Sequence, residues 1–368
     1  MTQGKRNQNH AGSEEKTFSV PFDVLENTEN ITINTNTPSK PSKEELINQA
    51  FDSHSKGNIQ EAAKYYQHFI NQGYKDYRVF SNYGVILKDT GKLKEAEISY
   101  RKAIEIKSDF VEAYSNLGTI LRDMGNLKEA EISTRKAIEL KPNFADAYSN
   151  LGDILKDAGK LKEAELYTRK AIAINPHHAN AIFNLGIILK ELGKLQEAEL
   201  STRKAIKIKP DYAEAHSNLG SILKDMGRLQ EAELSTRKAI ELNPDYAEAY
   251  SNVGNILRDI GNLKEAEKSY QKAIEVNPNF LEAYSNLGSI LKDLAEYEES
   301  RSFYKKCLEL DPTNLAYNIQ AKLFISRIPS TQLQIKKERE EVNKQISLIG
   351  NDKSIIFKNN RFPSSIDF

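Results

Sequence analysis

The chain has no tryptophan and a single cysteine, Cys307, among its 368 residues. One thiol excludes an internal disulfide framework and is typical of a protein from a reducing compartment. No run of about 18 apolar residues occurs, so we expect no membrane-spanning segment. The N-terminal stretch MTQGKRNQNHAGSEEKTFSV contains no apolar signal-peptide core. These absences together predict a cytoplasmic protein.

The chain also lacks an excess of charge of either sign, since 52 basic and 52 acidic side chains cancel. This balance gives no indication of a nucleic-acid partner. The sequence contains no phosphate-binding loop, dinucleotide fingerprint or zinc-protease motif. His177 and His178 are neighbours, but a structural metal site needs about four ligands at set spacing. We therefore predict no enzymatic activity, no cofactor and no metal, and we expect Cys307 to be a buried, inert thiol.

Most of the chain consists of a 34-residue sequence repeat that occurs seven times. Self-similarity at a short fixed period indicates one supersecondary unit that buries its apolar face only by stacking on its neighbours. The copies begin at Tyr77, Val111, Ala145, Ala179, Ala213, Ala247 and Leu281. Function is therefore expected on a surface that repeats.

Each copy predicts two helices, as residues 145–178 illustrate. Apolar side chains recur at helical spacing in the first half of the copy, and Gly159 then permits a tight turn. The second half carries a further apolar set that includes Ala164 and Leu166, and Pro176 ends it. Small residues such as Gly152 are expected where helices cross closely.

The remaining segments are predicted from composition and capping signals. The polar residues before Lys43 cannot bury enough apolar surface to fold alone. Ser42 and Glu45 form the capping box that begins the first helix. The predicted parts are a disordered tail at 1–42, a solenoid at 43–314 whose first repeat at 43–76 is degenerate, capping helices at 315–350, and an irregular tail at 351–368.

The repeat resembles the tetratricopeptide repeat. The resemblance rests on the spacing of large and small residues and covers roughly residues 43–314. In the third copy the matching residues are Tyr148, Leu151, Gly152, Leu155, Ala164, Ala171 and Pro176. It implies an all-α, right-handed superhelical solenoid of antiparallel helix pairs. In that family the first helices line an inner groove that binds extended peptides.

We number the positions of each copy from its first residue, so that Ala145 is position 1 of the third copy. Asparagine stands at position 6 of every copy, on the side of the first helix opposite its core stripe. A carboxamide offers a donor and an acceptor together, so a column of them could hold a peptide backbone regardless of its side chains. The asparagine column consists of Asn82, Asn116, Asn150, Asn184, Asn218, Asn252 and Asn286. It resembles the asparagine ladder of O-linked N-acetylglucosamine transferase repeats. Two alternatives stay open: the amides bond adjacent repeats together, or recent duplication copied them without selection.

Two charged columns flank the asparagines. Position 12 is always basic, as in Arg122, Lys156, Lys190 and Lys224, and position 13 is always acidic, as in Asp157 and Asp225. Position 2 lies on the same flank as position 13 and is acidic in five copies, at Glu112, Asp146, Glu214, Glu248 and Glu282. The helical wheel places these columns on opposite flanks and places the serine of position 5 on the same open face. We expect a groove with one basic and one acidic wall that orients an extended ligand.

The sequence therefore predicts a monomeric interaction scaffold whose concave groove binds a protein or peptide segment. The alternative is that the chain is the substrate-recognition arm of a glycosyltransferase related to O-linked N-acetylglucosamine transferases, whose catalytic domain lies outside residues 1–368. End-to-end self-assembly is less favoured, because the last copy departs from the pattern and further helices follow it.

Overall fold

The computed structural model describes residues 41–322, 336–337, 339–340 and 343–344. Within this part the chain forms seventeen α-helices and no strand, which confirms the all-α prediction. Residues 1–40 of the tail predicted at 1–42, the whole tail predicted at 351–368, and nearly all of 323–350 lie outside the described residues.

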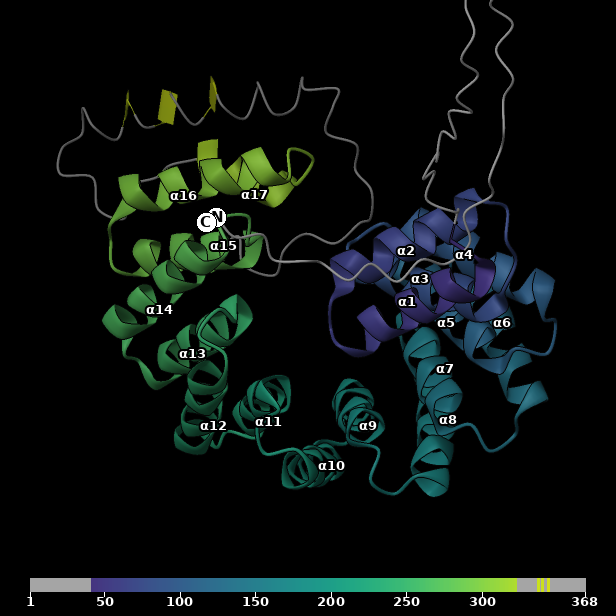
Figure 1. Cartoon of the computed structure of the whole chain (residues 1–368). Helices are drawn as coiled ribbons and strands as arrows, with labels where there is room; N and C mark the ends of the chain where they lie inside the picture. The colour runs from purple at the N-terminus through teal and green to yellow at the C-terminus, as the bar shows by residue number, and fades with distance from the viewer. Residues whose placement is uncertain (1–40, 323–335, 338, 341–342, 345–368) are drawn as a thin grey trace, which may run out of the picture. The chain divides into compact units, whose positions relative to one another are not determined.

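The chain divides into two compact units, Met1–Asn126 and Leu127–Phe368 (Figure 1). The first contains α1 (Lys43–Ser55), α2 (Ile59–Asn71), α3 (Tyr77–Asp89), α4 (Leu93–Ile106) and α5 (Val111–Asp123). The second contains α6 (Leu127–Leu140), α7 (Ala145–Asp157), α8 (Leu161–Ile174), α9 (Ala179–Glu191), α10 (Leu195–Ile208), α11 (Ala213–Asp225), α12 (Leu229–Leu242), α13 (Ala247–Ile260), α14 (Leu263–Val276), α15 (Leu281–Asp293), α16 (Tyr297–Leu310) and α17 (Leu315–Lys322).

The turn between the two helices of a repeat depends on a left-handed residue. Gly159 has a φ of 73°, a conformation that only glycine adopts without steric cost. The turn is closed by two backbone hydrogen bonds of 2.8 Å, from Gly159 N to Lys156 O and from Lys160 N to Leu155 O. These bonds satisfy two of the carbonyls left at the end of α7. In the last copy Ala295 takes the same conformation, with a φ of 65°.

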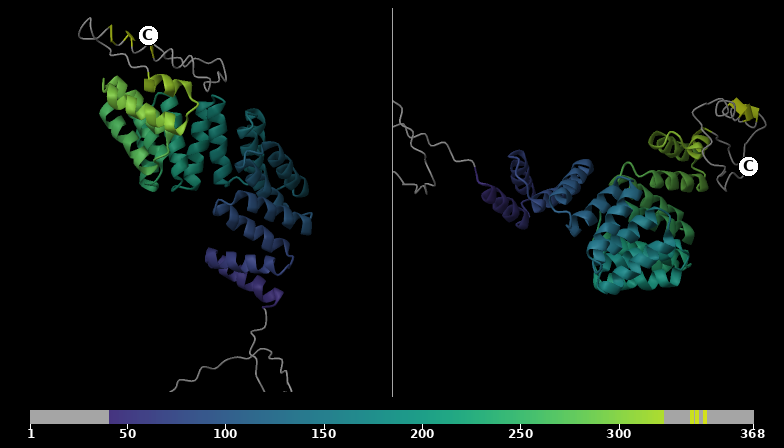
Figure 2. Two further views of the ribbon diagram at one scale, coloured as in Figure 1. Left: turned by 90° about the horizontal axis from the view of Figure 1, so that it is seen from above. Right: turned by 90° about the vertical axis from the view of Figure 1, so that its right-hand side faces the viewer.

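Small residues let the two helices of a repeat approach closely. Ala164 and Ala171 of α8 are fully buried. A Cβ added to Gly152 of α7 would lie 2.1 Å from the Thr168 hydroxyl of α8, so this position has no room for a side chain. The helix pairs follow one another in chain order within each unit (Figure 2).

The core is shared between neighbouring repeats. Leu151, Leu155 and Ala164 of one repeat form a buried cluster with Ile188 of the next. Each second helix also packs on the following first helix, as α8 does on α9 and α10 on α11. A single repeat could not bury these side chains alone, which explains the constant period.

The described ends of the helical array carry non-repeating features. At the N-terminal end Ser42 and Glu45 form the predicted capping box, with hydrogen bonds of 2.8 and 3.2 Å. At the other end α17 packs on α16, and Arg301 donates a 2.8 Å hydrogen bond to the Ala321 carbonyl. The predicted helix after the last repeat therefore begins at Leu315 and covers α16. Among the described helices, none has the length and apolar character needed to cross a bilayer.

Candidate peptide-binding face

The first helices of the repeats form one surface of the second unit. There α9, α11, α13 and α15 lie along the inner side of the curved row of helices, and α10, α12 and α14 lie along its outer side (Figure 1). On these first helices the side chains at positions 2 and 13 are exposed, and those at positions 6 and 9 are half-buried. The most accessible side chains of the surface are therefore the acids near the two helix ends.

The asparagine column lies between those two rows of acids, and all seven of its members are half-buried. Five of the amides donate a hydrogen bond from Nδ2 to a side chain of the preceding repeat. The acceptors are Tyr66 Oη for Asn82 (3.4 Å), Asp153 Oδ2 for Asn184 (2.8 Å), Thr202 Oγ1 for Asn218 (3.3 Å), Ser217 Oγ for Asn252 (3.0 Å) and Asn255 Oδ1 for Asn286 (3.3 Å). Bonding between adjacent repeats, one of the two alternatives to peptide binding, therefore occurs in the structure. Each of these bonds uses one N–H of the amide and leaves its Oδ1 as an acceptor.

The chemistry of the acceptors explains why the asparagine is constant while its neighbours vary. A carboxylate, two hydroxyls, a phenol and another amide all accept the same N–H. Two acceptors, Asp153 and Asn255, stand at position 9, which sequence reasoning did not single out because its residue type changes from copy to copy. The only sequence signal for them is their spacing, since residues three apart on a helix share a face.

The basic and acidic columns do not form separate walls, so the predicted two-walled groove is wrong. Lys190 Nζ lies 3.4 Å from Asp225 of the next repeat, and Lys224 Nζ lies 3.4 Å from Asp259. Within one repeat, Lys156 Nζ lies 3.1 Å from Asp157. In the first unit, Arg122 likewise lies 3.3 Å from Asp123. Positions 12 and 13 thus largely neutralise each other along one edge of the surface.

The opposite edge, at position 2, remains acidic. Glu214, Glu248 and Glu282 are exposed, and within the described part of the chain none of them forms an ion pair. Asp146 is the exception, because His178 Nε2 lies 2.9 Å from its carboxylate. The surface of α11, α13 and α15 therefore has one neutral edge and one negative edge.

The serines of position 5 do not lie on the open face, contrary to the prediction. Ser149 and Ser217 are 4 % and 2 % exposed. Ser217 faces the next repeat, where its hydroxyl accepts the hydrogen bond from Asn252. A wheel drawn for an isolated helix treats this flank as open, whereas in a solenoid the neighbouring repeat covers it.

A row of exposed aliphatic side chains marks the other surface of the second unit and was not predicted. Leu166, expected in the apolar stripe of its helix, is 52 % exposed. Its equivalents one repeat apart are at least as accessible: Ile132 at 69 %, Leu200 at 70 % and Leu234 at 71 %. The row ends where Lys268 and Ser302 replace the aliphatic residue.

The structure offers no metal or nucleophile chemistry in the part of the chain that it describes. There, no three His, Cys, Asp or Glu side chains are grouped so that they could hold a metal ion. Cys307 is fully buried, as expected, and burial raises the pKa of its thiol to about 12. Such a thiol is almost entirely protonated at neutral pH and is a poor nucleophile.

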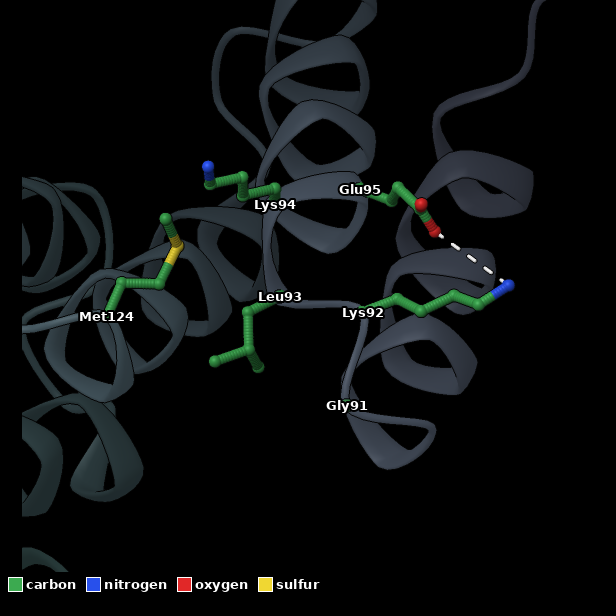
Figure 3. A pocket seen from close by; sticks show the side chains of 6 residues that line it. All are labelled: Gly91, Lys92, Leu93, Lys94, Glu95 and Met124. Carbon is green, nitrogen blue, oxygen red and sulfur yellow. Dashed lines mark ion pairs between the residues drawn. The ribbon is translucent and has the colours of Figure 1, made fainter.

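A hollow of about 450 Å³ in the first unit lies away from the asparagine column (Figure 3). It is lined by the turn between α3 and α4, from Gly91 to Glu95, and by Met124 at the end of α5. Its polar groups are an ammonium and a carboxylate 4.0 Å apart, on Lys92 and Glu95, and the side chain of Lys94. These groups form no catalytic arrangement.

Comparison with protein families identifies the repeats. Tetratricopeptide repeat descriptions match residues 111–144, 145–178, 213–246, 247–280 and 281–314, and further descriptions of the same repeat match 84–125, 167–199 and 188–227. Together the matches run without a gap from residue 84 to residue 314. The chain belongs to the tetratricopeptide repeat family, whose members commonly act as protein-interaction scaffolds.

Solved structures agree with this assignment of the fold. A tetratricopeptide repeat protein from Parabacteroides merdae ATCC 43184 is 21 % identical, with a TM-score of 0.54 over 67 % of this chain and 97 % of its own. The Cut9–Hcn1 hetero-tetramer of the APC/C gives 13 % identity and a TM-score of 0.60, over 76 % of this chain and 55 % of the other. Identities this low describe the fold alone. No match was found among curated proteins.

Proposed function

We propose that the chain is a scaffold that binds an extended protein segment along the first helices of its second unit, with the asparagine column holding the backbone of that segment. The observation that carries the proposal is the repeated half-buried amide. Asn184, Asn218 and Asn252 each use one N–H to bond the preceding repeat and keep an acceptor for a ligand.

The bond to the preceding repeat favours binding, because it fixes the orientation of the amide before a ligand arrives. A side chain that is already ordered loses less conformational entropy on binding. A peptide backbone presents one N–H per residue, so acceptors repeated along the solenoid can hold an extended segment without reading its side chains. Such binding explains why an amide is kept at position 6 while position 9 varies.

The test begins with a peptide selected from a random library against the full chain. Its affinity is then measured by fluorescence anisotropy for the wild type and for Asn252→Ala. Loss of one hydrogen bond of about 1 kcal/mol should weaken binding about fivefold. A second substitution, Asn218→Ala, should weaken it by a similar factor.

Ser217→Ala provides the matched control. It removes the acceptor of the Asn252 bond and so lowers the thermal stability, but it keeps the asparagine available to the peptide. We expect Ser217→Ala to weaken binding less than Asn252→Ala does, because it removes only the bond that orders the amide and keeps the amide oxygen that accepts from the peptide. Equal affinities for the wild type and Asn252→Ala, with both folded by circular dichroism, would show that the column only joins the repeats. A selected peptide whose affinity falls with Leu200→Ser instead would place the binding surface on the outer aliphatic row.

A further inference from the structure

We propose that a hollow lined by α12, α13 and α14 binds an aromatic side chain of a partner protein segment, with an acidic residue beside that side chain in the partner. The hollow has a volume of about 380 Å³, within the range of about 300–1,000 Å³ that is usual for ligand sites. Its lining includes Arg237 of α12, Tyr250 of α13, and Lys268, Ser269 and Lys272 of α14. No asparagine of the column lines it, so this inference goes beyond the proposed function.

The equivalent place three repeats earlier shows what such a hollow can hold. There the ring centre of Tyr167 lies 6.2 Å from that of Tyr148, with the two rings stacked. Arg135 donates a 2.9 Å hydrogen bond from Nη1 to Tyr167 Oη, and Lys170 Nζ lies 5.0 Å from the ring centre. At this place the chain itself therefore holds a phenol against a tyrosine ring and between two cations.

Around the hollow the same arrangement recurs without the inserted ring. Arg237, Tyr250 and Lys272 occupy the positions of the arginine, the stacking tyrosine and the lysine. Ser269 occupies the position of the inserted tyrosine, and its hydroxyl donates a 2.9 Å hydrogen bond to the Glu265 carbonyl of its own helix. A serine is too short to fill the space of a phenol, so the hollow lies where the ring of Tyr167 lies in the earlier repeat.

The arginine is oriented in the same way at both places. Arg135 donates from Nε and Nη2 to Glu131 Oε1 at 2.9 and 2.8 Å. Arg237 donates from Nε and Nη2 to Glu233 Oε1 at the same two distances. Nη1 of Arg135 binds the phenol, whereas Nη1 of Arg237 has no hydrogen-bond partner within the described part of the chain. A phenol from a partner would therefore meet a donor that is already in place.

Serine is the common residue at position 23, so Ser269 alone marks no site. The tyrosine at position 4 is what distinguishes this repeat. In α9–α10 and α11–α12, where position 23 is also serine, position 4 is Ile182 and His216. In α15–α16 the ring of Tyr284 has its own partner, since Phe303 lies 6.1 Å away between centres. Among the helix pairs of the second unit, α13–α14 alone combines a tyrosine at position 4 with a serine at position 23.

Lys268 adds a positive charge to the hollow. Position 22 is aliphatic in the five preceding copies, at Ile98, Ile132, Leu166, Leu200 and Leu234. Arg237 and Lys272 each lie 2.8 Å from a glutamate of their own helix, whereas Lys268 is exposed and forms no ion pair with any described residue. The sequence repeats the tyrosine–serine pair at Tyr114 and Ser133, but there position 22 is aliphatic. An ammonium without a counter-charge at this hollow favours a carboxylate in the partner.

These contacts define the chemistry of the ligand. A buried aromatic side chain gains from its apolar area, from the ring of Tyr250 and from cations near its faces. A tyrosine also has the hydroxyl that Arg237 Nη1 can bind. An aspartate or glutamate next to that tyrosine then reaches Lys268. The partner segment is therefore expected to carry a tyrosine with acidic neighbours.

The experiment uses the full-length protein and three labelled peptides with identical glycine–serine flanks. Their central residues are Asp-Tyr-Asp, Asp-Ala-Asp and Lys-Tyr-Lys, and their affinities are measured by fluorescence anisotropy. We expect the alanine peptide to bind about tenfold more weakly than Asp-Tyr-Asp, and the lysine peptide about threefold more weakly. Equal affinities for the tyrosine and alanine peptides would overturn the proposal.

Ser269→Tyr inserts the phenol of the third copy and should fill the hollow from within. We expect it to weaken the Asp-Tyr-Asp peptide about tenfold and to raise the melting temperature, because the new ring packs on Tyr250. Ser302→Tyr is the matched control, since it places the same side chain on an exposed position of α16 outside the hollow. It should change neither quantity. Equal losses of affinity in the two variants would contradict the site.

Lys268→Leu tests the acidic neighbour and keeps the fold, because leucine stands at this position in other copies. It should weaken the Asp-Tyr-Asp peptide about threefold and remove its advantage over the lysine peptide. Lys264→Leu, which removes an exposed lysine of the same helix outside the hollow, should leave that advantage intact. An advantage that persists in Lys268→Leu would show that this ammonium does not contact the partner.

Asn252→Ala separates this site from the proposed function. It should leave the affinities of all three peptides unchanged, because Asn252 does not line the hollow. If Asn252→Ala weakens the Asp-Tyr-Asp peptide and Ser269→Tyr does not, the peptide binds along the first helices and the hollow is no site. If Ser269→Tyr alone weakens it, the hollow binds the aromatic residue whether or not the asparagine column holds a backbone.

Discussion

The close approach of the two helices of a repeat depends on single atoms at position 8 of the first helix. In the third copy, a Cβ on Gly152 would lie 2.1 Å from Thr168 Oγ1 and 3.4 Å from the Ala164 carbonyl oxygen. The Thr168 hydroxyl is buried and has no hydrogen-bond partner in the structure. The Thr168 hydroxyl thus leaves no room for a side chain at position 152, and no hydrogen bond offsets the cost of its own burial.

We predict that Gly152→Ala destabilises the protein by about 1–3 kcal/mol through overpacking. Thr168→Ala should be nearly neutral, because it removes a buried hydroxyl without a partner. The double variant should recover most of the loss. Thermal denaturation of the three variants measures the effect, and a double variant no more stable than Gly152→Ala would contradict the explanation.

A second prediction concerns Ala295, which has a φ of 65° where the equivalent turns of the six other copies have glycine. The left-handed conformation costs a residue with a side chain about 1 kcal/mol. Ala295→Gly should therefore stabilise the end of the array by up to about that amount, and Gly159→Ala should have the opposite effect. Hydrogen exchange of α15 and α16 is the local measurement, and faster exchange in Ala295→Gly would refute it.

At this scale the sequence predicted only part of the arrangement around the candidate site. The asparagine column was predicted on a solvent-facing side and lies half-buried between repeats, because the sequence gives the helix face but not the depth of the neighbouring repeat. The bonds to Asp153, Thr202 and Ser217 could not be predicted, since their acceptors differ in type and belong to another repeat. Cys307 was correctly predicted as buried, because it replaces an alanine of the core.

At the scale of the helices, ion pairs connect successive repeats. Lys194 Nζ donates a 2.7 Å hydrogen bond to Glu165 Oε2 of the preceding repeat, and Arg169 donates to the other oxygen of that carboxylate at 2.9 Å. The bond from Lys194 is the main reason that the pKa of Glu165 lies below its ordinary value of 4.5. Lys160 and Arg135 make the equivalent contacts with Glu131.

These pairs predict how stability depends on pH. A carboxylate whose pKa is lowered in the folded state contributes stability above pH 4.5, and that stability is lost as the pH falls and the folded carboxylate is protonated. Glu165→Gln should lower stability at neutral pH by about 1 kcal/mol or less. The difference from the wild type should disappear below the folded pKa. Melting temperatures measured across acidic pH check this, and a difference that persists at the lowest pH would contradict it.

The glycine turn and the proline predicted where the two helices of the third copy end, since α7 ends at Asp157, just before Gly159, and α8 ends at Ile174, just before Pro176. The exposure of Leu166 was not predicted, because an apolar residue at helical spacing gives no information on whether the next repeat covers it. Burial in a solenoid depends on neighbouring repeats, and the periodicity of one helix does not report their position. The same reason explains the error over the basic and acidic columns, which meet across the boundary between repeats.

At the scale of the whole molecule, the second unit is built from nearly interchangeable interfaces. The cluster that joins Leu185, Leu189 and Ala198 to Ile222 has the same composition as the one that joins Leu151, Leu155 and Ala164 to Ile188. Stability in such an array is approximately a sum of repeats and nearest-neighbour interfaces.

We therefore predict that deletion of residues 213–246 leaves a folded, helical protein whose melting temperature is lowered by several degrees. The deletion joins Tyr212 to Ala247, so α10 meets a first helix with the same core residues as before. Deletion of half a repeat, residues 213–229, should instead disrupt packing, because two second helices would become neighbours. Circular dichroism with thermal melting distinguishes the two, and equal damage from both deletions would refute the modular description.

Repetition gives a ligand a choice of register along the array. A segment that met only identical amides could move along the solenoid by one repeat and find the same groups, so its register would be degenerate. The acceptors that bond Asn184, Asn218 and Asn252 differ from one repeat to the next, and this difference breaks the translational symmetry of the surface. A segment that contacted the acceptors as well as the asparagines would have one register in place of several.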